Sequence, residues 1–65
     1  MKMKYQLLIQ RLEVEIMTTN EKLEDYKEIY SMNDSNIVVK SMIKMYKERI
    51  KQYNDAITLL KSSNN

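Results

Sequence analysis

Apolar side chains recur at alternating steps of three and four residues along most of the chain, with one interruption. This spacing aligns them along one seam of an α-helix and is the pattern of a coiled coil. The pattern predicts two long helices, over residues of about 2–31 and about 36–62, which each carry one such seam. The seam residues are Tyr5, Ile9, Leu12, Ile16, Thr19, Leu23, Tyr26 and Tyr30, followed by Val39, Ile43, Tyr46, Ile50, Tyr53, Ile57 and Leu60.

The interruption is the polar stretch SMNDSN at residues 31–36. Ser, Asn and Asp bond to nearby backbone groups, so they favour helix caps and turns. We expect Asn33 to be a left-handed C-cap and Asp34 or Ser35 to be the N-cap of the second helix. A turn of about residues 32–35 makes the two helices antiparallel neighbours. The sequence therefore predicts an all-α fold, a single coiled-coil-like antiparallel two-helix hairpin over residues 1–65.

The two seams pair layer by layer in such a hairpin. Tyr30 lies opposite Val39 and Leu23 opposite Tyr46, and the residue numbers have the same sum at every level. The heptad patterns of the two predicted helices are therefore in register with each other when the chain folds back at the one turn. Most layers set a large ring against a smaller side chain, and all tyrosines belong to the seam, where we expect the rings to pack and the hydroxyls to reach water. Thr19 is the one polar residue of the seam.

Apolar residues beside the seam form a further surface, which we name the second apolar face. They occupy heptad positions g and c, and a helix with so broad an apolar side is typical of a four-helix bundle. A chain of 65 residues without Cys or His lacks disulfides and common zinc sites, so association is the remaining route to stability. We expect a homodimer, with Glu15 of one copy near Lys22 or Arg49 of the other. The predicted interface residues are Leu8, Ile29, Val38, Met42, Met45, Ala56 and Leu59.

A second row of surplus apolar residues, the back stripe, follows the outer side of the first helix. It consists of Met3, Leu7, Val14 and Met17, with Gln10 between them. One interpretation is a loosely apolar surface or a contact within the oligomer. The other is a binding site for a different protein, because methionine suits adaptable contacts and exposed apolar stripes mark interaction sites.

The second helix also carries a row of basic side chains at heptad positions b and e, which we name the lysine row. Two copies in a dimer would present enough cations to attract a phosphate backbone at low salt. However, arginine, which reads base edges, is absent from the row, and no aromatic residue interleaves for stacking. These features favour a solvated face, with nucleic-acid binding as the alternative. The residues concerned are Lys40, Lys44, Lys47, Lys51 and Lys61.

Composition argues against catalysis. The chain has no His, Cys or Gly, which excludes His- or Cys-based nucleophilic sites and glycine-rich phosphate loops. The acidic residues Glu21, Glu24, Asp25 and Glu28 are interpreted as a solvated face of the first helix. We therefore predict no catalytic, metal-binding or cofactor-binding residue, and no enzyme. Apolar runs do not exceed three residues, so we expect no membrane span or signal core and a cytoplasmic protein.

In length and topology the hairpin resembles Rop-type proteins, short plasmid proteins that dimerise into four-helix bundles and bind paired RNA loops. No motif is shared, and no residue role carries over. The chain also lacks the Ser-Gln-Glu-Leu-Asp signature of the helical-hairpin sporulation phosphatases, since its second helix reads VVKSMIKMYKERI. The favoured hypothesis is a small non-enzymatic regulator or adaptor that binds another protein, such as a phage- or plasmid-encoded inhibitor. The alternative is a Rop-like dimer that binds RNA or DNA through the lysine row.

Overall fold

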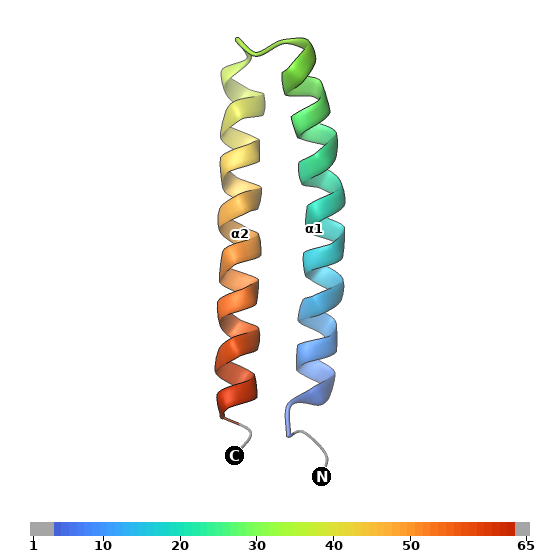
Figure 1. The fold of residues 1–65 in the computed structure, drawn as a ribbon, viewed down its shortest axis with the longest axis vertical. Coiled ribbons are helices and arrows are strands. Elements are labelled where there is room, and N and C mark those ends of the chain that lie inside the picture. Colours follow the sequence, from blue (N-terminus) through green and yellow to red (C-terminus); the bar gives the residue numbers. More distant parts are fainter. Residues whose placement is uncertain (1–3, 64–65) are drawn as a thin grey trace.

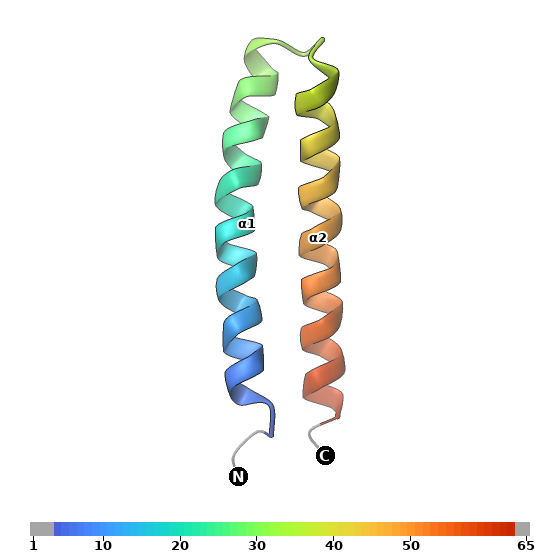
Figure 2. The ribbon, with the colours of Figure 1, turned by 180° about the vertical axis from the view of Figure 1, so that it is seen from behind.

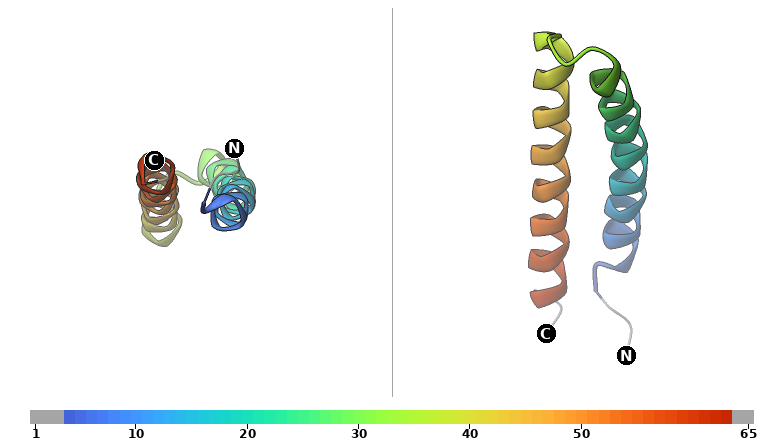
Figure 3. Two further views of the ribbon diagram at one scale, coloured as in Figure 1. Left: turned by 90° about the horizontal axis from the view of Figure 1, so that it is seen from below. Right: turned by 45° about the horizontal axis from the view of Figure 1, so that its top comes forward.

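The chain folds as two antiparallel α-helices joined by a short turn, in a computed structural model that describes residues 4–63. Helix α1 spans Gln6–Met32 and helix α2 spans Ile37–Ser62. The helices lie side by side over their whole length, and the turn lies at the end opposite both termini (Figure 1). The view from behind and the view along the helices show the same single layer (Figures 2 and 3). The all-α hairpin predicted from the seam pattern is confirmed.

The core of the hairpin is the seam. Every seam residue is buried or half-buried, and the apolar side chains buried most deeply are Ile9, Leu23, Val39 and Ile57. The tyrosines of the seam are half-buried. The rings of Tyr26 and Tyr46, from neighbouring layers, meet with their centroids 5.6 Å apart and their planes at 34°. Tyrosine therefore packs in the seam, as expected, in layers that also hold deeply buried side chains such as Leu23 and Val39.

The turn differs in detail from the expectation. Asn33 has φ of −148°, and no residue between Lys4 and Ser63 has a positive φ, so the predicted left-handed C-cap is wrong. The backbone N–H of Asn33 instead donates to the carbonyl of Ile29 over 3.1 Å. The Asn33 side chain closes the turn, because its Oδ1 accepts from the backbone N–H and the hydroxyl of Ser35 at 3.3 and 2.7 Å.

The N-cap of α2 is Asn36, and the prediction of Asp34 or Ser35 is wrong. The Asn36 Oδ1 accepts a hydrogen bond from the backbone N–H of Val39 over 3.1 Å, which satisfies one of the free donors of the first turn. Ser35 is already engaged by Asn33, and Asn36 is the residue with extended backbone angles, φ −78° and ψ 105°. The four residues that precede α2, at positions 33–36, are all of types that can cap a helix, and the last of them is the N-cap.

Helix α1 begins later than the predicted residue 2. Lys4 and Tyr5 lie in a turn, and Tyr5 occupies the N-cap position without a side-chain cap hydrogen bond. The Lys4 ammonium instead lies 5.4 Å from the centroid of the Tyr5 ring. The described helices therefore have closely matched lengths of 27 and 26 residues, and each is about 40 Å long.

The hairpin is long and thin. It measures 50 × 15 × 11 Å, with a radius of gyration of 15.1 Å, whereas a compact domain of this length has about 11 Å. Two helices of this kind can enclose only a narrow seam, and most side chains remain at the surface. Neither helix of residues 4–63 is long and apolar enough to cross a lipid bilayer. Most of the surface that could serve a function therefore lies outside the seam.

Thr19 is a buried polar residue in the middle of the seam, with 5% of its surface exposed. Its hydroxyl donates to the Glu15 carbonyl over 2.7 Å. That carbonyl also accepts the backbone N–H of Thr19 in the regular helix, so it keeps a partner when the hydroxyl is removed. Such hydroxyl bonds to the preceding turn slightly destabilise a helix. The Thr19 hydroxyl therefore contributes little that a methyl group would not.

We expect Thr19→Val to raise the free energy of unfolding by up to about 1 kcal/mol, because it exchanges a desolvated hydroxyl for apolar burial of the same shape. Urea unfolding at one protein concentration measures the change. The matched control is Thr18→Val at the neighbouring exposed position, where we expect a change within about 0.5 kcal/mol. A clear loss of stability in Thr19→Val would mean that the hydroxyl has a needed role in the seam.

Candidate functional surfaces

The back stripe is exposed on the outside of α1. Leu7, Val14 and Met17 have 81%, 55% and 64% of their surface accessible, and Gln10 between them is exposed as well. Met3, the first predicted member, lies outside the described residues. Helix α2 does not cover these side chains, because they occupy the heptad positions that point away from the seam. The three described members are therefore not part of the core of the hairpin.

The same heptad positions change character further along α1. After Met17 they carry Glu21, Glu24 and Glu28, all exposed, with the same alternation of three and four residues. Glu24 Oε1 lies 3.6 Å from the Lys27 ammonium, a pair within the helix. The back of α1 is thus one continuous line, apolar near the termini and acidic near the turn. The sequence interpretation separated these two halves and did not join them.

The second apolar face runs along one edge of the hairpin. Met42 and Ala56 are half-buried beside the seam, whereas the remaining predicted members are exposed. These exposed members are Leu8, Ile29, Val38, Met45 and Leu59. The face has apolar residues towards both ends of the hairpin and charged residues in the middle.

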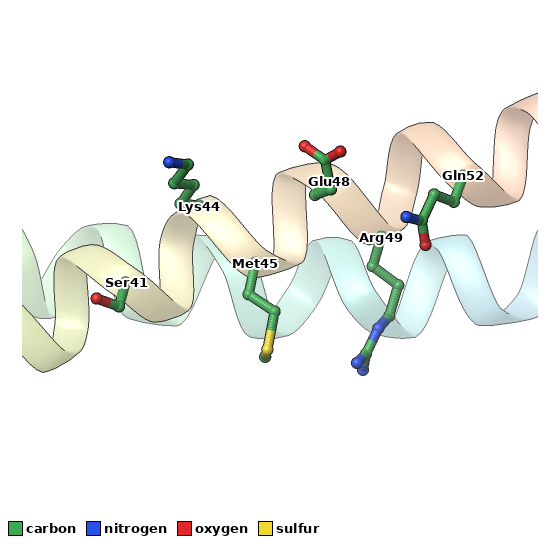
Figure 4. A pocket seen from close by; sticks show the side chains of 6 residues that line it. All are labelled: Ser41, Lys44, Met45, Glu48, Arg49 and Gln52. Atoms are coloured by element: carbon green, nitrogen blue, oxygen red, sulfur yellow. The ribbon is translucent and has the colours of Figure 1, made fainter.

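The middle of the second apolar face is charged. Glu15 is half-buried, and its Oε1 lies 3.6 Å from the Arg11 Nε. Lys22 and Arg49 are exposed. Arg49 and Met45 project to the same side of α2, while Lys44 and Glu48 point the other way (Figure 4).

A shallow groove follows this part of α2 (Figure 4). All of its lining residues come from α2, so it is a furrow between side chains of one helix and offers no enclosed site for a small molecule. Its lining residues are Ser41, Lys44, Met45, Glu48, Arg49 and Gln52.

Two exposed apolar residues beside the turn were missed by the sequence interpretation. Met32 ends α1 with 76% of its surface accessible, and Ile37 begins α2 with 77%. Met32 occupies heptad position c, so it extends the second apolar face past Ile29 towards the turn. Met32 was assigned to the polar break, and Ile37 was placed in the predicted second helix without being assigned to any apolar face.

The lysine row is fully exposed along α2. All five predicted lysines are at the surface, and the Lys51 ammonium forms an ion pair with the Asp55 Oδ2 at 3.2 Å. An exposed pair of this kind contributes little to stability. It does reduce the positive charge in the middle of the row. The structure brings the lysines onto one face, as the spacing predicted, without adding an aromatic platform beside them.

Comparison with known proteins adds no relative to this picture. No family model, no curated protein and no solved structure matches the chain.

Proposed function

We propose that the protein is a small non-enzymatic adaptor or inhibitor that binds another protein through the back of α1. In this proposal it acts in the cytoplasm as a homodimeric four-helix bundle, and a phage- or plasmid-encoded regulator of a host protein would suit its size. The observation that carries the proposal is the exposure of Leu7, Val14 and Met17 on a face that the hairpin does not use. A contiguous exposed apolar stripe is typical of an interaction site.

The line along α1 also indicates the chemistry of the partner. Its apolar half fits a hydrophobic groove of the kind that accepts one face of a helix through residues spaced by three and four. Its acidic half, Glu21, Glu24 and Glu28, fits a basic rim at one end of that groove. The acidic half would raise the association rate and fix the direction of α1, because surface charges steer encounter more than they add affinity.

The test is a pull-down from the native host with three forms of the protein, each with and without nuclease. Leu7→Asp combined with Val14→Asp places two charges in the apolar half and should abolish capture of the protein partner. The change should leave the fold intact, because neither residue belongs to the seam. The control replaces Lys44, Lys47 and Lys51 by Gln on the other helix and should retain the partner. A Leu7→Asp/Val14→Asp variant that captures the partner as well as the unmodified protein refutes the site.

Nucleic-acid binding through the lysine row is the alternative function. The observation that favours it is the exposure of all five lysines on one face of α2. If it is correct, affinity for RNA or DNA falls steeply with salt, because each neutralised phosphate releases counterions. The triple Lys→Gln variant would then lose binding and flatten the salt dependence, while Leu7→Asp/Val14→Asp would bind normally. The two functions therefore predict opposite outcomes for the same pair of variants.

A further inference from the structure

The hairpin exposes more surface than a compact protein of its size. Its accessible area is 5334 Å², whereas a compact monomer of 7.9 kDa exposes about 4400 Å². The excess of about 900 Å² is close to the roughly 800 Å² per partner that a standard stable interface buries. Helix α2 carries the broader apolar side, and its half-buried Met42 and Ala56 lie at the inner edge of the second apolar face. One more hairpin on this face would convert the narrow seam into a bundle core.

We propose that a second copy of this chain covers the second apolar face about a two-fold axis perpendicular to the helices. The turn of one copy then lies at the end where the other copy has its termini. Each helix packs against its own counterpart, α1 on α1 and α2 on α2. The arrangement rests on the dimeric state included in the proposed function and does not depend on which macromolecule the dimer binds.

The g positions of α1 support this axis. They are Leu8, Glu15, Lys22 and Ile29, in the order apolar, acidic, basic, apolar. A perpendicular two-fold axis between Glu15 and Lys22 sets Leu8 against Ile29 of the second copy. It also sets Glu15 against Lys22 of the second copy. Both contacts occur twice by symmetry, so apolar residues meet apolar residues and opposite charges meet.

The g positions of α2 agree with the same axis. Met42 and Ala56 lie symmetrically about Arg49, so Met42 meets Ala56 of the second copy. Arg49 falls on the axis and faces its own counterpart, the one unfavourable contact of the arrangement. The axis positions deduced from α1 and from α2 differ by about 2 Å along the hairpin, which is within the scatter of helix packing. Two independent helices therefore indicate one symmetry axis.

An axis parallel to the helices fits less well. It would place α1 of one copy on α2 of the other, with the turns at the same end. Lys22 would then face Arg49 of the second copy, and Glu15 would face Ala56. The parallel axis would therefore give two like-charge contacts and would place two acidic side chains against apolar partners. The perpendicular axis gives two opposite-charge pairs instead. The charge pattern selects the perpendicular axis.

Crosslinking of single-cysteine variants tests the arrangement, because the chain has no cysteine of its own. Leu8→Cys and Ile29→Cys are refolded alone and as an equal mixture, then treated with a short thiol crosslinker. We expect crosslinked dimers from the mixture and not from either variant alone. The control mixture, Ile29→Cys with Met42→Cys, should stay uncrosslinked, since Ile29 of one copy meets Met42 of the other copy only in the arrangement with the parallel axis.

The possible outcomes separate the dimer from its geometry. Crosslinking of the control mixture, or of neither mixture in a protein that light scattering shows to be dimeric, overturns the perpendicular arrangement and leaves the dimer standing. A monomer at several hundred micromolar overturns both. Charge reversal gives an independent readout: Glu15→Lys should weaken dimerisation roughly tenfold, and adding Lys22→Glu to it should restore the original dissociation constant. A double variant no tighter than Glu15→Lys contradicts the proposed pairing.

Discussion

Replacing Leu23 by Ala is expected to lower the free energy of unfolding by about 2–4 kcal/mol. Leu23 is among the few deeply buried apolar side chains, with 5% of its surface exposed, and the seam places it opposite the Tyr46 ring. Truncation removes buried methyl groups and leaves a space beside the Tyr46 ring. A small domain has a total stability of only about 5 kcal/mol or less from its core, so the loss is a large fraction of it.

Urea unfolding followed by circular dichroism, at one fixed protein concentration, measures the effect. The matched control is Leu7→Ala, the same change at a position of α1 with 81% of its surface exposed. There we expect a change within about 0.5 kcal/mol. Equal losses in the two variants would show that Leu23 is not part of a packed seam. Ile57→Ala provides a second buried site on α2 and should resemble Leu23→Ala.

The architecture was predictable because one physical signal dominates this chain. The two apolar rows repeat with the same period and register about a single polar break, so only one pairing buries both. The observed helix ends, Met32 and Ile37, keep that register. The absence of Gly and Pro removes competing turns elsewhere in the sequence. Local helix preference and long-range burial therefore agree.

The turn was less predictable for an equally physical reason. Residues 33–36 are Asn, Asp, Ser and Asn, and each of them can cap a helix or close a turn. The choice depends on which side chain is already engaged. The Asn33 Oδ1 takes both donors of Ser35, and this leaves Asn36 to cap α2. Which of these side chains becomes the cap depends on the three-dimensional geometry of the turn, and it cannot be predicted from residue type alone.

The sequence predicted which residues lie on the candidate surfaces, but it did not predict what those surfaces bind. Heptad assignment showed that Leu7, Val14 and Met17 are not seam residues, and the structure shows them exposed. The partner was not predictable, because an exposed apolar side chain has the same chemistry whatever later covers it. The structure also shows that the apolar back stripe and the acidic residues from Glu21 to Glu28 form one continuous line along α1. This line restricts the kind of groove that could receive it.

The second apolar face leads to the other large expected effect, a loss of dimerisation in the double variant Met42→Glu with Met45→Glu. Met42 is half-buried at the edge of the seam and Met45 lies one turn further along the face. In the proposed dimer the change places four carboxylates within the interface, two of them against Ala56 of the other copy, and burial of a charge without a partner is strongly disfavoured. We expect the dissociation constant of the dimer to rise at least about a hundredfold, which corresponds to about 3 kcal/mol. Sedimentation over a range of concentrations measures it.

The control for this experiment must change the charge by the same amount without touching the face. Ser41→Glu with Lys44→Gln does so, since both residues are exposed on α2 at positions that point away from the second copy. Linkage provides a second readout, because the melting temperature of a dimer rises with protein concentration and that of a monomer does not. The unmodified protein and the control should show this rise. The Met42→Glu/Met45→Glu variant should lose it, and a variant that keeps both its concentration dependence and its dissociation constant would exclude the second apolar face as the dimer interface.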